Sequence, residues 1–171
     1  MPPRNRSDRP GPLAAYLAEV GEITRSQAGT PETSLYGPLE ALLSRVGSTL
    51  AEPVRAIMQL RNDGAGMPDG GFFDTKQMSA TKGLPAAVTS GDGRIFSGQP
   101  PTHGVIEAKP IDADLGALAR TPQVKKYLNR YGRVLLTNYR QFLVVELTPD
   151  GAMSRGETFT ISDSPAEFGV R

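Results

Sequence analysis

The chain has 171 residues, of which 38% are hydrophobic and 22% charged, with a formal net charge of +1, a composition that fits one soluble globular domain with its own core. It contains no cysteine and a single histidine, His103, which excludes disulfide bonds, thiolate zinc sites, cysteine nucleophiles and multi-histidine metal sites. Any bound metal must therefore have oxygen ligands, which points to Mg²⁺, Mn²⁺ or Ca²⁺.

The first residues do not have the form of a targeting signal. Residues 1–12 contain three arginines and no apolar run, unlike a signal peptide. No apolar stretch reaches the length needed to cross a membrane. We therefore expect a cytoplasmic protein without a membrane partner, and we expect residues 1–30 to be a flexible segment with one short amphipathic helix over residues 13–23.

The hydrophobic pattern predicts an α/β domain over residues 31–148. Apolar residues at helical spacing predict a helix over residues 36–50, and Pro122 in a first turn supports another over residues 121–131. Strands are expected over residues 54–60, 67–73, 103–109, 134–137 and 142–147. This order of one helix, three strands, one helix and two strands is typical of a sheet with helices packed on it.

Three further segments complete the prediction. The first two strands are expected to form a hairpin, with Asp63 and Gly64 at the turn. Residues 74–102 are rich in Gly, Pro, Ser and Thr, which predicts a long loop or insertion. Residues 149–171 carry no strong pattern and are expected to be a polar tail or a linker to a missing module.

Positive charge is concentrated late in the predicted domain. Residues 115–145 contain no acidic residue and the following basic ones: Arg120, Lys125, Lys126, Arg130, Arg133 and Arg140. Such segregation suits a surface that faces phosphates. A solvated helix face without a ligand is the simpler alternative.

Two carboxylates and a lysine are expected to lie close together at one end of the sheet. Glu107 and Lys109 are two positions apart on a strand, so their side chains project from the same face while Ala108 points to the other. Asp69 is expected on the neighbouring strand. Because Pro110 must end the strand, these charges fall at its carboxyl end, a frequent location for α/β active sites.

This set of groups is suited to metal-assisted hydrolysis of a phosphodiester. Asp69 and Glu107 can hold Mg²⁺ as hard oxygen ligands, with the Ala108 carbonyl as a third. Lys109 can orient the attacking water and stabilise developing charge. The structural alternative is that Asp69 caps a turn, while Glu107 and Lys109 form an exposed ion pair of little energetic weight.

Three segments, GAGMPDGGFF, PTHGVIEAKP and QVKKYLNRYGRVLLTNYRQFLVVEL, resemble the N-terminal nuclease region of Type ISP and Type IIG-like restriction–modification enzymes. In these enzymes a nuclease and an adenine-specific DNA methyltransferase share one chain. The resemblance spans residues 32–168 and implies a restriction-endonuclease-like PD-(D/E)XK fold, a mixed sheet flanked by helices. It matches Asp69, Glu107 and Lys109 to the acid, acid and lysine of that motif. The sequence contains no methyltransferase motif, neither Asn-Pro-Pro-aromatic nor a Gly-rich cofactor loop.

The resemblance also implies an acidic residue on the first helix of the fold that reaches the metal through water. Glu40 is the candidate and Glu32 the second choice, whereas a solvent-facing helix glutamate is the structural alternative for Glu40. The long loop after the first acid leaves its identity open, so Asp63 and Asp74 are alternatives to Asp69.

A Q-x-x-x-Y helix follows the lysine strand in some members of the family. Gln123 and Tyr127 match it, standing at i and i+4 on one helix face. Lys126 and Arg130 extend that face, so these four residues are the predicted contacts to DNA phosphates or the metal site. Ordinary packing of Tyr127 is the alternative.

The sequence thus predicts a metal-dependent DNA endonuclease domain of a restriction–modification system, with Mg²⁺, or Mn²⁺ in its place, as cofactor. The expected partners are DNA, a methyltransferase or translocase module in the same or another chain, and a second copy in a homodimer. One alternative is a non-catalytic nuclease-fold DNA-binding module of a DNA methyltransferase protein. The other is a soluble α/β interaction domain.

Overall fold

The computed structural model describes residues 10–29, 33–60, 65–79, 100–164 and 168. Within these residues one mixed sheet has six strands: β1 (Val54–Met58), β2 (Gly70–Asp74), β3 (Val105–Ala108), β4 (Arg133–Thr137), β5 (Gln141–Leu147) and β6 (Met153–Thr160). The helices are α1 (Pro12–Ser26), α2 (Tyr36–Gly47), α3 (Thr75–Ser79), α5 (Leu115–Leu118) and α6 (Pro122–Tyr131). The predicted α/β class, a mixed sheet flanked by helices, is confirmed.

The strands lie in the sheet in the order in which they occur along the chain. The β1–β2, β2–β3, β4–β5 and β5–β6 pairs are antiparallel, and only the β3–β4 pair is parallel. A parallel pair needs a crossover connection, and α5 and α6 supply it. Helix α6 begins as the sequence predicts, with Pro122 in its first turn and the Thr121 hydroxyl accepting the amide of Val124.

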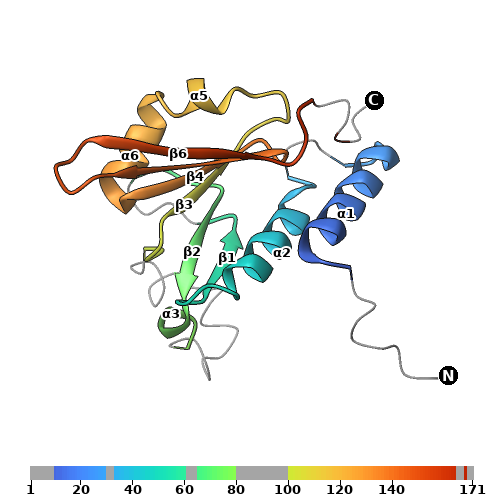
Figure 1. Ribbon diagram of the computed structural model, residues 1–171, viewed down its shortest axis with the longest axis horizontal. Coiled ribbons are helices and arrows are strands. Elements are labelled where there is room, and N and C mark those ends of the chain that lie inside the picture. Colours follow the sequence, from blue (N-terminus) through green and yellow to red (C-terminus); the bar gives the residue numbers. More distant parts are fainter. Residues whose placement is uncertain (1–9, 30–32, 61–64, 80–99, 165–167, 169–171) are drawn as a thin grey trace.

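Helices cover both faces of the sheet, as Figure 1 shows, with α1 and α2 on one side and α5 and α6 on the other. Side chains alternate between the two faces along each strand. On β3, Ile106 and Ala108 pack toward α1 and α2, while Val105 packs toward α6. Glu107 therefore faces the α6 side of the sheet.

The chain on either side of the predicted domain also belongs to the folded unit. Strand β6 pairs with β5 over residues that were expected to form a polar tail. All of its residues except the half-buried Ser154 are exposed, so it has none of the apolar alternation by which a strand is recognised. At the other end, Tyr16 and Val20 of α1 are buried in the core with α2. Boundaries at residues 30 and 148 therefore cut through this packed structure.

Some of the remaining sequence expectations concern residues outside the described part of the chain, and others can be compared with the structure. Residues 61–64, with the predicted turn at Asp63 and Gly64, lie outside the described residues, as do Glu32 and residues 80–99. The start of the expected long loop is regular, because Asp74 ends β2 and α3 follows it. None of the helices in residues 10–29, 33–60, 65–79 and 100–164 has the length and apolar character that crossing a membrane requires.

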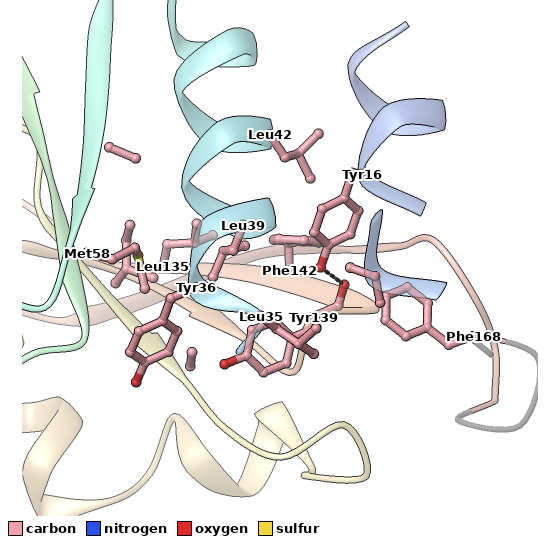
Figure 2. Close-up of a cluster of buried hydrophobic side chains, with 14 residues drawn as sticks. Tyr16, Leu35, Tyr36, Leu39, Leu42, Met58, Leu135, Tyr139, Phe142 and Phe168 are labelled. Carbon is pink, nitrogen blue, oxygen red and sulfur yellow. Dashed lines mark hydrogen bonds between the residues drawn. The ribbon is translucent and has the colours of Figure 1, made fainter. Parts of the chain in front are cut away.

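A buried hydrogen bond joins α1 to the turn between β4 and β5. The Tyr16 hydroxyl donates to the carbonyl of Tyr139 at 2.7 Å, and Figure 2 shows this bond among the apolar side chains of the cluster. Tyr139 has a φ of 69°, a left-handed conformation that is uncommon for a residue other than glycine. The bond thus links α1 to a turn whose backbone must be held in place.

Substituting Tyr16→Phe should lower the free energy of unfolding by about 1 kcal/mol at neutral pH, the usual net contribution of one buried hydrogen bond. Urea denaturation followed by circular dichroism measures this loss. If α1 were a flexible segment outside the fold, the variant and the wild type would unfold at the same urea concentration.

The same variant should also respond differently to alkaline pH. Burial raises the pKa of the Tyr16 hydroxyl well above its usual value, so the folded state keeps a proton that the unfolded state releases. The stability this group contributes is present below about pH 10 and is lost as pH rises above it, by about 1.4 kcal/mol per pH unit. Tyr16→Phe should make that alkaline decline shallower.

Candidate active site

The register of β2 and β3 brings Asp69 and Glu107 together. Gly70 pairs with Ile106 and Gly71 with Val105, so one further step along both strands sets Asp69 opposite Glu107. The Ala108 amide donates to Asp69 Oδ2 at 2.8 Å. Asp69 directly precedes β2 instead of lying within it as predicted, and its side chain continues the contact between the strands after the ladder ends.

Two glycines, Gly70 and Gly71, leave room for the close approach between β2 and the residues on either side of it. A Cβ atom on Gly70 would lie 2.6 Å from the sulfur of Met58 and 2.9 Å from the carbonyl oxygen of Ile57. A Cβ on Gly71 would lie 2.5 Å from a ring carbon of Pro101. A larger residue at either position would push β2 away from its neighbours, and Asp69 with it.

Glu107 and Lys109 form an ion pair that is largely buried. Lys109 Nζ lies 2.6 Å from Glu107 Oε1, and the two side chains are 30% and 2% exposed. The Lys109 amide donates to the Thr137 carbonyl on β4 at 2.9 Å, which fixes the backbone beyond the end of β3. The alternative of an exposed surface pair is therefore wrong, because a carboxylate this deeply buried requires a compensating charge.

Helix α6 completes the inner wall of the site. The Gln123 side-chain amide donates to Glu107 Oε1 at 3.2 Å and to the Tyr127 hydroxyl at 3.0 Å. The pKa of Tyr127 is raised by burial first, and the charges of Glu107 and Asp69 raise it further, while Gln123 and Lys109 oppose them. The Tyr127 hydroxyl thus lies in the electrostatic field of Asp69, Glu107 and Lys109 together.

The predicted nucleic-acid face of α6 divides into an inner and an outer part. Tyr127 is buried and faces the site, so its ring is packed as the structural alternative held. Lys126 and Arg130 are exposed, and the Arg130 guanidinium lies 5.8 Å from the ring centre of Tyr131. The outer part is exposed to solvent.

Two other basic residues of the charge-segregated stretch have partners within the protein. Arg133 pairs with Glu146 at 2.8 Å. Arg140 is buried, and its guanidinium donates to the carbonyls of Ile111, Ser162 and Asp163. The expectation that all six basic residues belong to one phosphate-facing surface is therefore wrong for Arg140, whereas the Arg133 pair is exposed and leaves the expectation for that residue open.

Glu40 has a backbone partner. Its Oε2 atom accepts the Met58 amide at 3.0 Å, and Met58 pairs with Gly70, so the carboxylate holds the end of β1 close to the residue after Asp69. Glu40 is half-buried, in contrast to the solvent-facing glutamate of the structural alternative.

Of the alternatives to Asp69, Asp74 lies at the far end of β2. It pairs with Val54, and its carboxylate accepts the Gln77 amide at 2.8 Å and the Thr102 hydroxyl at 3.3 Å. The Gln77 amide is the largest cause of its lowered pKa. Asp74 is thus a cap on α3, and the other alternative, Asp63, lies outside the described residues.

The structure adds Tyr36, a residue to which sequence analysis gave no role. Its hydroxyl donates to Asp69 Oδ1 at 2.7 Å. The two residues are 33 positions apart in the sequence, and the only related signal is that Tyr36 stands one helical turn before Glu40.

The donors at this site fit an oxygen-ligated metal. Among the described residues, no group of three or more His, Asp and Glu side chains could by itself hold a metal ion, so a complete protein cage is not available there. Mg²⁺, however, is commonly held by one or two carboxylates, with water and substrate phosphates completing the shell. Asp69 and Glu107 are carboxylates, and the Ala108 carbonyl is a further oxygen donor, so these residues are of the kind that could hold such an ion.

No family model matches the chain, and no curated protein matches it either. A chain in the cryo-EM structure of the DrdV–DNA complex is similar in fold, with a TM-score of 0.56 and 15% sequence identity. The superposition covers 89% of this chain and 87% of that one. At this identity the likeness concerns the fold, and the chemistry must be argued from the residues.

Substituting Lys109→Met should lower the free energy of unfolding by about 2 kcal/mol in EDTA. The expected loss lies below the usual cost of breaking a buried pair because the Lys109 side chain is 30% exposed. The double variant Glu107→Gln, Lys109→Met should recover most of the loss, since no buried charge remains. Urea denaturation of all three proteins measures both effects, and equal destabilisation of single and double variants would contradict the charge argument.

Proposed function

We propose that this chain is a metal-dependent DNA endonuclease domain of the PD-(D/E)XK type. The observation that carries the proposal is the meeting of Asp69 and Glu107 at the ends of β2 and β3, with Lys109 Nζ 2.6 Å from Glu107 Oε1. Two acids can hold one Mg²⁺ ion, and a lysine beside them can stabilise the charge that develops when a phosphodiester is hydrolysed.

Asp69, Glu107 and the Ala108 carbonyl are the proposed ligands of Mg²⁺, or of Mn²⁺ in its place. When bound, such an ion neutralises charge on the phosphate and makes a water molecule a better nucleophile. Lys109 lies at the partly exposed edge of the site and can donate to a phosphate oxygen or hold the attacking water. Gln123 keeps the Glu107 carboxylate oriented, so that the site is preorganised before the substrate arrives.

DNA is the proposed substrate for two reasons. Lys126 and Arg130 are exposed on α6, one helical turn apart and beside Gln123, where phosphates near the site would pass. The structurally similar DrdV is in complex with DNA. We further propose that the domain works beside a methyltransferase or translocase module in a restriction–modification system, as the sequence resemblance implies.

A DNA-binding module without catalysis is the second candidate. It is favoured by the observation that no cluster of three acidic or histidine side chains is available among the described residues. Such a module would keep the basic face of α6 and its salt-sensitive affinity for DNA, and it would lack metal-dependent cleavage.

Substituting Asp69→Asn should reduce Mg²⁺-dependent cleavage of plasmid DNA by at least about 100-fold, the usual scale for loss of a metal ligand or charge stabiliser. The fold should persist, because asparagine can still accept a hydrogen bond from Tyr36 or Ala108. Nicking of supercoiled plasmid, followed on agarose gels with Mg²⁺ and with EDTA, measures the effect.

The matched control is Asp74→Asn, which removes an acid from the far end of β2, where the carboxylate caps α3 and accepts the Thr102 hydroxyl. This control should keep wild-type cleavage. Full activity in Asp69→Asn would refute the assignment, whereas wild-type protein that binds DNA without Mg²⁺-dependent nicking would favour the non-catalytic module.

DNA binding should be sequence-independent and should weaken as salt rises. Each phosphate contact contributes about −0.9 to the slope of log affinity against log salt on duplex DNA, so Lys126→Ala, Arg130→Ala should make the slope shallower by about 2. Lys125→Ala, on the opposite side of α6 by helical periodicity, should leave the slope unchanged. Fluorescence anisotropy across a salt series measures the slope for the wild type, for the double variant and for Lys125→Ala. If Lys125→Ala changed the slope as much as the double variant does, the DNA contact would not lie on the face of Lys126 and Arg130.

A further inference from the structure

Asp69 lies just before β2, beyond the last residue of the regular β2–β3 ladder. Three neighbouring elements bind it instead. The amide of Gln59, just after β1, donates to the Asp69 carbonyl. The amide of Ala108 on β3 donates to Oδ2 at 2.8 Å, and the Tyr36 hydroxyl donates to Oδ1 at 2.7 Å. Of these three donors, Tyr36 is the one that donates from its side chain, so its bond can be removed by substituting the donor.

The ring of Tyr36 is firmly anchored. It is 9% exposed and belongs to the core cluster between the sheet and helices α1 and α2. Figure 2 shows this ring at the margin of the cluster, near Met58, with its hydroxyl directed away from Leu39. The hydroxyl therefore reaches out of an apolar core to the Asp69 carboxylate.

The helix that carries Tyr36 is also fixed against the sheet by polar contacts. Ser44 Oγ accepts the Ala56 amide at 3.1 Å and donates to the Ala56 carbonyl at 3.3 Å, and Glu40 Oε2 accepts the Met58 amide at 3.0 Å. Because these bonds set the position of α2 along β1, the Tyr36 hydroxyl is delivered to a fixed point beside Asp69.

We infer that Tyr36 is a positioning residue for the metal site, and this inference rests on the proposed function. Its hydroxyl and the Ala108 amide hold one oxygen each of the Asp69 carboxylate. Each carboxylate oxygen has further acceptor capacity, so the two bonds orient the carboxylate and leave it able to bind a cation beside Glu107. A hydrogen bond of this kind to a metal ligand commonly changes metal affinity by 10- to 100-fold.

The chain supplies a matched control in Tyr16. Tyr16 is also buried in the α1–α2 cluster, and its hydroxyl also donates a 2.7 Å hydrogen bond, but to the backbone carbonyl of Tyr139 in the turn between β4 and β5. Tyr16→Phe and Tyr36→Phe therefore remove the same atom from similar surroundings. Only the second removes it from a proposed metal ligand.

The experiment is a titration of the full chain with Mn²⁺, in the absence of DNA, followed by the electron paramagnetic resonance signal of the free ion. The wild type, Tyr36→Phe, Tyr16→Phe and Asp69→Asn are compared, and circular dichroism checks that each is folded. We expect Tyr36→Phe to weaken Mn²⁺ binding roughly tenfold, Tyr16→Phe to bind as the wild type does, and Asp69→Asn to lose the site.

The outcomes separate the inference from the proposed function. If Asp69→Asn loses the Mn²⁺ site while Tyr36→Phe binds as tightly as the wild type, the positioning role is overturned and the metal site stands. If Tyr16→Phe weakens binding as much as Tyr36→Phe, the effect is one of general stability and the positioning role is again overturned. If wild type and Asp69→Asn bind Mn²⁺ equally or not at all, the proposed metal site fails, and the inference with it.

Discussion

The amide of Ala108 donates its hydrogen bond to the side chain of Asp69, at the point where the β2–β3 ladder stops. That bond joins the two strands through a carboxylate, at the residue that the continued register sets opposite Glu107. The neighbouring elements are arranged around it. Gly70 and Gly71 let β2 approach closely enough for the bond to form, and Tyr36 on α2 holds the second oxygen of the same carboxylate.

The two faces of the sheet contribute differently to this point. On the face covered by α1 and α2, an apolar cluster anchors Tyr36. On the other face, α6 places Gln123 and Tyr127 over the buried Glu107. A buried carboxylate is costly unless it is paired, and Lys109 supplies the pairing from a position that remains 30% exposed. The Glu107 carboxylate is thus buried, whereas the Lys109 side chain remains partly accessible to solvent.

Much of the fold follows from local signals in the sequence. Apolar runs predicted β3, β4 and β5 to within two residues, and Pro122 marked the first turn of α6. Strand β6 escaped prediction because nearly all its residues are exposed on both faces. Its place is set by hydrogen bonding to β5, a tertiary effect that periodicity does not record.

The site follows the same division between local and long-range signals. The spacing of Glu107 and Lys109 on one strand predicted their proximity, since alternate residues share a face. The bond between Tyr36 and Asp69 joins residues from separate elements and has no counterpart in sequence spacing. Charge counting likewise grouped Arg140 with the basic residues of α6, although it is buried and bonded to three carbonyls. Burial depends on the whole fold, so the sign of a residue's charge cannot reveal it.

The proposed metal site requires Asp69 and Glu107 to bind one divalent metal ion together. A crystal structure of the chain grown with Mn²⁺ and a short DNA duplex, with anomalous diffraction measured at the manganese edge, tests it most directly. We expect an anomalous peak within coordination distance of both carboxylates and of a phosphate oxygen. By analogy with Mg²⁺, the manganese should lie about 2.0–2.2 Å from its oxygen ligands. A peak bound only elsewhere on the protein, or DNA bound with no peak between these two residues, would contradict it.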